Sequence, residues 1–158
     1  MRQAVDAGIP RVNVVQLAHR GHTERISRGV YRYINYPYSA NAAYWEALLW
    51  PQGNAAVAVT LSHETALLFH RLTDINPSEV HVTITPDVRI MREIPTYLRI
   101  HRHAFAEKDV ELLDGLTVTT LARTLRDLYR AGTSRAFLEQ ALELARKRHL
   151  VPPDFRIA

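Results

Sequence analysis

Six arginines in the first 36 residues are the side chains of this chain best placed to do chemistry: Arg2, Arg11, Arg20, Arg25, Arg28 and Arg32. Only Asp6 and Glu24 oppose them, so the segment carries a net charge of +4, while the remaining 122 residues hold 14 basic and 14 acidic side chains. A focused cationic segment attracts a polyanion because each neutralised phosphate releases condensed counterions. The charge distribution predicts a nucleic-acid partner, against the alternative of a basic surface that is merely solvated.

Three polar residues lie on one line of the helix expected from Pro10 to about Arg20. Asn13, Gln16 and Arg20 share this line, and a neighbouring stripe is expected to be buried: Val14, Leu17, Ala18 and Gly21. Asn and Gln can pair with adenine, and Arg with guanine, in the major groove. We therefore expect Asn13, Gln16 and Arg20, together with Arg11, to read DNA bases.

The remaining arginines of the segment surround a predicted hairpin. β-forming residues flank a turn at Ser27, Arg28 and Gly29, and the two strands would bring Arg25, Arg28 and Arg32 close together. These three side chains are predicted to contact DNA phosphate, which positions a protein without specifying sequence. A helix, a turn, a second helix and a basic hairpin are the parts of a winged helix-turn-helix.

The eight histidines do not predict a metal site. His101 and His103 are two apart on an expected strand, but the sequence shows no third ligand or carboxylate beside them. His63 and His70 share one face of an expected helix, where packing or capping is the simpler interpretation. No metal and no other cofactor are expected.

The sequence also gives little support to catalysis. Neither Lys108 nor Lys147 lies in the acid-x-Lys arrangement that many metal-dependent nucleases use, and Ser62 and His63 are not part of a Gly-x-Ser-x-Gly motif. There is no glycine-rich phosphate loop. We therefore expect a protein that is not an enzyme and has no catalytic residues.

The rest of the chain predicts an α+β fold. A helix over residues 2–7 and a linker over residues 37–41 are expected around the elements above, which places a domain boundary near residue 37. Further helices are expected over residues 40–50, 62–72, 120–129 and 134–149, and strands over residues 56–61, 79–85, 97–103 and 116–118. Ser62, Thr119 or Thr120, and Thr133 or Ser134 are expected to cap helices with their hydroxyl groups.

Composition narrows the class of protein. Hydrophobic residues make up 47% and charged residues 23% of the 158 residues, which is typical of a folded globular protein. There is no cysteine, and no apolar run approaches the length of a membrane span, so we expect a cytoplasmic protein with no membrane partner.

Four segments, taken together, resemble the AbiEi family of antitoxins and transcriptional regulators from bacterial toxin-antitoxin systems. They are residues 25–32 (RISRGVYR), 61–66 (LSHETA), 80–84 (VHVTI) and 114–127, which contains DGLTVTT followed by ARTLRD. The resemblance implies an N-terminal winged helix-turn-helix, residues 1–36, that binds inverted repeats in its own promoter. It also implies a C-terminal α/β antitoxin domain, residues 37–158, that counteracts a nucleotidyltransferase-like toxin without forming a stable complex with it.

The chain departs from the family pattern at its start. The family's winged helix normally begins with a further helix, whereas only nine residues precede Pro10 here. We therefore expect a truncated winged helix-turn-helix: either the true start lies upstream, or another part of the molecule or a second chain covers Ala4, Val5 and Ile9.

These observations predict a DNA-binding antitoxin and autorepressor, with two copies bound to an inverted repeat. Two alternatives remain: a metal-dependent nuclease-related protein, and an interaction domain that has lost DNA binding.

Overall fold

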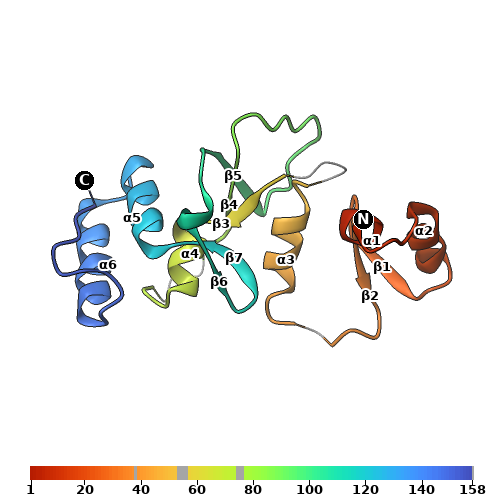
Figure 1. The fold of residues 1–158 in the computed structure, drawn as a ribbon, viewed down its shortest axis with the longest axis horizontal. Helices are drawn as coiled ribbons and strands as arrows, with labels where there is room; N and C mark the ends of the chain where they lie inside the picture. The colour runs from red at the N-terminus through yellow and green to blue at the C-terminus, as the bar shows by residue number, and fades with distance from the viewer. Residues whose placement is uncertain (38, 53–56, 74–76, 158) are drawn as a thin grey trace. The chain divides into compact units, whose positions relative to one another are not determined.

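The computed structural model describes residues 1–37, 39–52, 57–73 and 77–157, which form two compact units, Met1–Val59 and Thr60–Ala158 (Figure 1). The first unit contains two helices, a hairpin and a third helix: α1 (Arg2–Asp6), α2 (Arg11–His19), β1 (Thr23–Ser27), β2 (Val30–Tyr33) and α3 (Ala42–Leu49). This element order is the predicted one. The predicted domain boundary near residue 37 stays a prediction, and the predicted linker includes Tyr38, which lies outside the described residues.

Glycines end the first two helices, as the sequence predicts. Gly8 has φ +78° and Gly21 has φ +73°, backbone conformations that L side chains rarely adopt. The chain can therefore leave α1 and α2 sharply, and α2 packs against β1. The turn of the hairpin is held to the start of the chain, because the Met1 amino group donates a hydrogen bond of 2.7 Å to the Gly29 carbonyl oxygen.

A five-stranded mixed sheet organises the rest of the chain. Its strands are β3 (Val59–Leu61), β4 (Val80–Ile84), β5 (Leu98–Arg102), β6 (Val110–Leu113) and β7 (Leu116–Thr119), in the spatial order β5-β4-β3-β7-β6. β4 pairs with β5, and β3 with β7, in parallel, whereas β6 and β7 are antiparallel. The strand predicted over residues 56–61 is confirmed for its last three residues, and Ala56 lies outside the described part of the chain.

Helices α4 (His63–Phe69), α5 (Leu121–Arg130) and α6 (Arg135–Lys147) pack in succession beside this sheet, and a short 3-10 helix, η1 (Glu107–Asp109), precedes β6. α4 lies against β4 and β7, α5 against α4, and α6 against α5 (Figure 1). Leucines fill the space between the helices: Leu67, Leu72, Leu121, Leu125, Leu128 and Leu138. The predicted α+β class, with a small sheet and several helices, is confirmed. Among the described helices, none has both the length and the hydrophobicity that a bilayer span requires.

The β6–β7 hairpin was not predicted, although its turn carries a strong sequence signal. Asp114 and Gly115 form the turn with φ +50° and φ +80°. Asp-Gly between β-forming residues is typical of a two-residue hairpin with both turn residues at positive φ. The prediction took β7 alone because Glu111, in the middle of β6, is charged.

The predicted caps have different outcomes. Ser134 accepts a hydrogen bond of 3.3 Å from the Phe137 backbone N–H and caps α6 as predicted. Ser62 and Thr120 occupy N-cap positions, but their hydroxyls make no capping hydrogen bond. For Ser62 the prediction is wrong because its Oγ lies 3.0 Å from His63 Nδ1 instead.

Arg123 forms a buried ion pair with Asp127 within α5 and also contacts the segment that follows β5. The Arg123 Nε donates to Asp127 Oδ2 at 2.7 Å, and the Arg123 Nη1 donates to the Ala104 carbonyl oxygen at 3.0 Å. Asp109 Oδ2 lies 3.3 Å from the same Nη1. Asp127 is only 1% exposed, so its charge must be neutralised within the protein.

We expect Asp127→Ala to lower the free energy of unfolding by about 3 kcal/mol, because removal of one partner leaves the buried Arg123 guanidinium poorly compensated. Urea denaturation followed by circular dichroism measures the change. Glu139→Ala is the matched control, because it breaks the exposed i,i+4 pair with Arg135 and should cost about 0.5 kcal/mol or less. Equal losses in the two variants would contradict a special role for the buried pair.

Candidate functional site

The polar line predicted on α2 is exposed. Asn13, Gln16 and Arg20 are all solvent-accessible, whereas Val14 is buried. At about 100° per residue, the three polar residues fall within roughly 60° of one another around the helix axis. One face of α2 therefore offers an amide, a second amide and a guanidinium to a ligand, which is the donor and acceptor set that reads adenine and guanine.

Arg11 does not share this face. The same helical geometry places Arg11 roughly 140–200° from the three polar residues. Arg11 lies instead near the start of α1, where its positive charge adds to burial in lowering the pKa of the Met1 amino group. The structure thus separates Arg11 from the other three predicted base-reading residues.

The predicted phosphate-contacting arginines are divided between the faces of the hairpin. Glu24 pairs with Arg32 across the strands, and the next register pair is Arg25 with Tyr31, so Arg25 and Arg32 point to opposite faces. Arg32 Nη2 donates to Glu24 Oε2 at 2.7 Å. Arg25 is exposed, and Arg28 lies in the turn. The sequence analysis expects the three arginines close together and identifies neither this division between faces nor the acidic partner of Arg32.

Apolar side chains are also exposed on the first two helices. Val5, Ile9, Val12 and Val15 are each at least 39% exposed. Val5 and Ile9 are two of the three residues that we expected to be covered by another element or another chain. Within this chain, the described residues leave them open.

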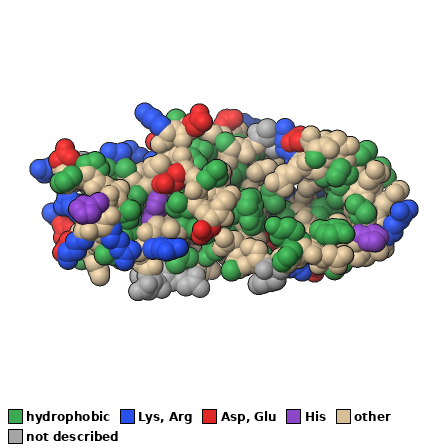
Figure 2. All heavy atoms as spheres, turned by 60° about the horizontal axis from the view of Figure 1, so that its bottom comes forward, with side chains coloured by type: hydrophobic (Ala, Val, Ile, Leu, Met, Phe, Trp, Pro, Cys, Tyr) green, Lys and Arg blue, Asp and Glu red, His purple; other side chains and the backbone are tan. Residues whose placement is uncertain are grey.

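Residues 121–158 form a second basic region. The sequence analysis does not identify it, because residues 37–120 carry a net negative charge of equal magnitude. Residues 121–158 hold eight basic and four acidic side chains, whereas residues 37–120 hold six basic and ten acidic ones. Figure 2 shows Lys and Arg side chains gathered over the C-terminal helices on the face in view. Counting charge in shorter windows would have revealed this region.

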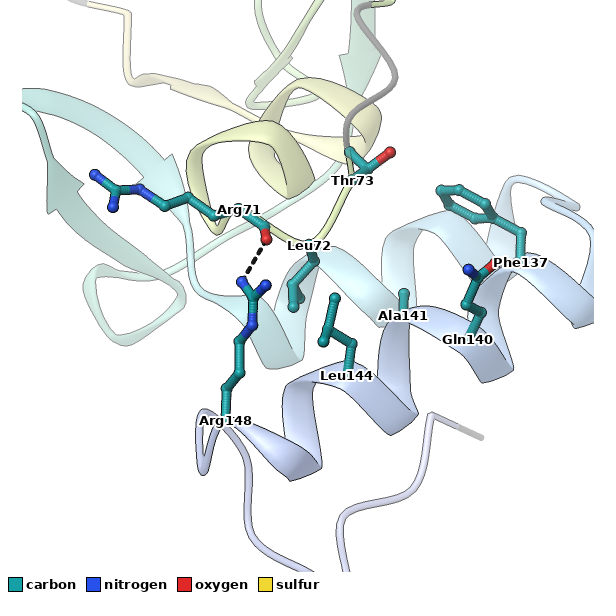
Figure 3. A pocket seen from close by; sticks show the side chains of 8 residues that line it. All are labelled: Arg71, Leu72, Thr73, Phe137, Gln140, Ala141, Leu144 and Arg148. Carbon is teal, nitrogen blue, oxygen red and sulfur yellow. Dashed lines mark hydrogen bonds between the residues drawn. The ribbon is translucent and has the colours of Figure 1, made fainter.

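Two pockets are each lined by described residues of a single unit. One, of about 340 Å³, lies between the end of α4 and α6 (Figure 3). Its charged residues are both arginines: Arg148 donates a hydrogen bond of 2.6 Å to the Arg71 carbonyl oxygen, and the Arg71 side chain points away. Another, of about 620 Å³, lies between the hairpin and α3 and is mainly aromatic and apolar.

Three histidines converge at one place on the sheet of the second unit, and this corrects the interpretation of the histidines in the sequence. His63 begins α4, His81 lies on β4 and His101 on β5, and each offers a ring nitrogen within 4.8 Å of the others. His101 is thus joined by two imidazoles from distant segments, and His103, its expected partner, is not part of this group. His70 takes no part, because its Nε2 lies 2.9 Å from the Thr119 carbonyl oxygen.

A carboxylate completes this cluster. Glu64 Oε2 lies 3.0 Å from His81 Nδ1, and His101 Nε2 lies 3.2 Å from the same Nδ1. The His63 and His101 rings stack with their centroids 3.6 Å apart. The two β4–β5 residues share one sheet face, because the parallel register pairs His81 with Arg99 and Thr83 with His101. We call His63, Glu64, His81 and His101 the histidine cluster.

The protonation states in the histidine cluster follow from burial and mutual repulsion. Burial, reinforced by the charges of neighbouring imidazoles, lowers the pKa of His63 to about 3 and that of His101 to about 4. Contact with the His81 ring lowers the pKa of Glu64 to about 2. Near neutral pH, His63 and His101 are therefore neutral and Glu64 is ionised.

The backbone at His63 is strained. His63 is 2% exposed and has φ +52°, in the left-handed region that a non-glycine residue adopts at a cost of about 1–3 kcal/mol. Arg71, Asp114 and His149 also have positive φ, but they lie directly after helices or in the hairpin turn, where it is common. Only His63 adopts it as the first residue of a described helix.

Comparison with known proteins gives a match confined to the start of the chain. Residues 1–34 match the family model described as "Transcriptional regulator, AbiEi antitoxin". The match covers α1, α2 and the β1–β2 hairpin, that is, the elements that carry the exposed polar line and the hairpin arginines. No curated protein matches the chain.

Acid should weaken the fold through the histidine cluster. His63 has a pKa of about 3 in the folded protein against an ordinary value of 6.5, so the unfolded chain binds more protons between these values. His63 alone should therefore lower the free energy of unfolding by about 2 kcal/mol between pH 7 and pH 5, and His101, with a pKa of about 4, should add to this loss. Urea denaturation over this range, with a chelator present, measures the loss.

Replacing His63 by Gln should make stability less dependent on pH in this window. His19→Gln is the control, because His19 is exposed on α2 in the other unit. A pH dependence that persists unchanged in His63→Gln would show that another group causes the loss.

Proposed function

We propose that this chain is a DNA-binding transcriptional regulator of the AbiEi antitoxin type that represses its own promoter. The proposal rests on two observations about residues 1–34: their match to the family model and the side chains that they expose. The family match ends at residue 34, and the same segment carries an exposed row of polar side chains, of types able to pair with bases, on a helix that precedes a basic hairpin. This element order favours a winged helix-turn-helix.

In this proposal α2 enters the major groove with Asn13, Gln16 and Arg20 toward the base edges. Arg25 and Arg28 contact phosphate from the hairpin. Arg32 contributes less, because its ion pair with Glu24 already satisfies part of its charge. Arg11 lies near the sugar-phosphate backbone of the DNA rather than near the bases, because it is on another face of α2.

Binding to an inverted repeat requires two copies of the chain. One recognition helix reads one half-site, and the half-sites of a helix-turn-helix dimer are about 34 Å apart or a multiple of this distance. The exposed residues Val5, Ile9, Val12 and Val15 give the first unit an apolar surface that another element or a second copy would cover.

The antitoxin part of the proposal concerns the second unit. By its likeness to the AbiEi family, the chain would counteract a nucleotidyltransferase-like toxin without forming a stable complex. No residue is assigned to this activity. Co-expression of a candidate nucleotidyltransferase-like toxin with this chain, with and without residues 1–36, measures whether protection depends on DNA binding.

Gln16→Ala and Arg20→Ala should each weaken binding to the promoter repeat by about 1–3 kcal/mol and leave binding to random duplex nearly unchanged, because they remove base contacts. Gel-shift titrations on the two duplexes measure the difference. Gln140→Ala, an exposed substitution on α6, is the control. If neither α2 variant alters the ratio of the two affinities, α2 is not the recognition helix.

Arg25→Ala and Arg28→Ala should weaken binding to all sequences alike and reduce the salt slope of log K by about 0.9 each, because each removes one phosphate contact. Glu24→Gln should have the opposite effect, since it releases Arg32 from its ion pair. Fluorescence anisotropy at several salt concentrations measures the slopes. Slopes that stay equal to wild type in all three variants would exclude the hairpin as a phosphate-binding element.

A further inference from the structure

The histidine cluster brings together three atoms that carry lone pairs. His81 Nδ1 lies 3.0 Å from Glu64 Oε2 and 3.2 Å from His101 Nε2. At metal–ligand distances of about 2.0–2.1 Å, two donor atoms that share an ion at tetrahedral or octahedral angles lie roughly 2.9–3.4 Å apart. Both separations fall in this range.

Hydrogen bonding alone satisfies this arrangement poorly. If His81 Nδ1 is protonated and donates to Glu64 Oε2, this N–H is not free to donate to His101 Nε2, whose lone pair then has no donor. If His101 Nε2 donates to His81 Nδ1, two acceptors, Nδ1 and the ionised Glu64 oxygen, lie 3.0 Å apart. The buried Glu64 Oε2 makes no hydrogen bond of acceptable angle with the described residues, despite its closeness to the ring. A cation at His81 Nδ1 would relieve both conflicts, and this nitrogen belongs to a group of three imidazoles, His63, His81 and His101, whose nitrogen atoms lie within 4.8 Å of one another.

The surroundings of the three atoms also suit a cation. Glu64 supplies a negative charge, and the His81 and Glu64 side chains are 15% and 35% exposed, although the Glu64 Oε2 atom itself is buried. Thr83, the register partner of His101, has a buried hydroxyl with no hydrogen-bond partner in the described part of the chain.

His63 can complete the coordination after one movement. Its ring is nearly parallel to that of His101, with an angle of 13° between the planes. Two parallel, offset rings cannot both direct an in-plane lone pair at one point, so the His63 ring must rotate before it can act as a ligand. Two or three imidazoles and one carboxylate are ligands that Zn²⁺ and neighbouring divalent transition metals prefer, whereas Mg²⁺ and Ca²⁺ prefer oxygen.

We propose that the histidine cluster is a binding site for one divalent transition-metal ion of the Zn²⁺ class, with His81 Nδ1, His101 Nε2 and Glu64 Oε2 as its ligands and His63 as the fourth after rotation of its ring. The site belongs to the second unit, outside the residues that match the family model. It is independent of the DNA-binding proposal, because none of its residues lies in the first unit.

Isothermal titration of the chelator-treated, dialysed full chain with ZnCl₂ tests the site. We expect one Zn²⁺ per chain, and a dissociation constant raised at least 100-fold by His81→Ala or His101→Ala. Glu64→Gln, at a partly exposed residue, should raise it at least tenfold without disturbing the fold. His19→Ala, exposed in the other unit, should bind Zn²⁺ as wild type does.

Thermal unfolding followed by circular dichroism separates loss of binding from loss of structure. Zn²⁺ should raise the midpoint for wild type and His19→Ala, because it binds the native state, and should raise it much less for Glu64→Gln. Co²⁺ should give visible absorption bands with wild type that are lost in Glu64→Gln. The proposal is overturned if wild type binds no Zn²⁺, or if folded Glu64→Gln, His81→Ala and His101→Ala bind it as tightly as wild type.

Discussion

The carboxylate of Asp127 has almost no contact with solvent, and this constrains much of the second unit. A buried charge is stable only when it is paired and hydrogen-bonded, so Arg123 must lie beside it on the same face of α5. The guanidinium in turn reaches the Ala104 carbonyl and Asp109, which fixes the segment between β5 and β6 against α5. The position of β6, and through its hairpin that of β7, follows from this contact.

The histidine cluster depends on the resulting strand order. β3 lies between β4 and β7, and the chain leaves β3 directly into the strained backbone of His63. The strain turns the start of α4 so that His63 and Glu64 meet side chains from β4 and β5. Strain of this kind persists only where the surrounding packing holds it, and the fully buried Leu61 and Ala66 on either side supply that packing.

Local patterns predicted most elements of this chain, because glycine positions and alternating apolar residues act over a few neighbouring residues. The ends of α1 and α2 at Gly8 and Gly21, and the strand over residues 80–84, are of this kind. The β6 strand was missed because only its turn residues, Asp114 and Gly115, carried the signal.

A site could be predicted from the sequence only where its residues lie close together along the chain. The exposed line of Asn13, Gln16 and Arg20 lies within one helix, so helical spacing was enough to find it. The histidine cluster joins β3–α4, β4 and β5, and no local spacing connects His63 to His101. The ion pair of Glu24 with Arg32 depends on hairpin register, which the sequence did not specify.

The parallel pairing of β4 and β5 has a consequence for the order of folding. Parallel neighbours need a long connection, and here residues 85–97 cross over with no helix or strand of their own. The entropy of closing this loop must be lost before any β4–β5 contact forms, whereas the β6–β7 hairpin and the α5–α6 pair form from adjacent segments. His81 and His101 therefore meet after these local elements have formed, because their contact depends on the β4–β5 pairing.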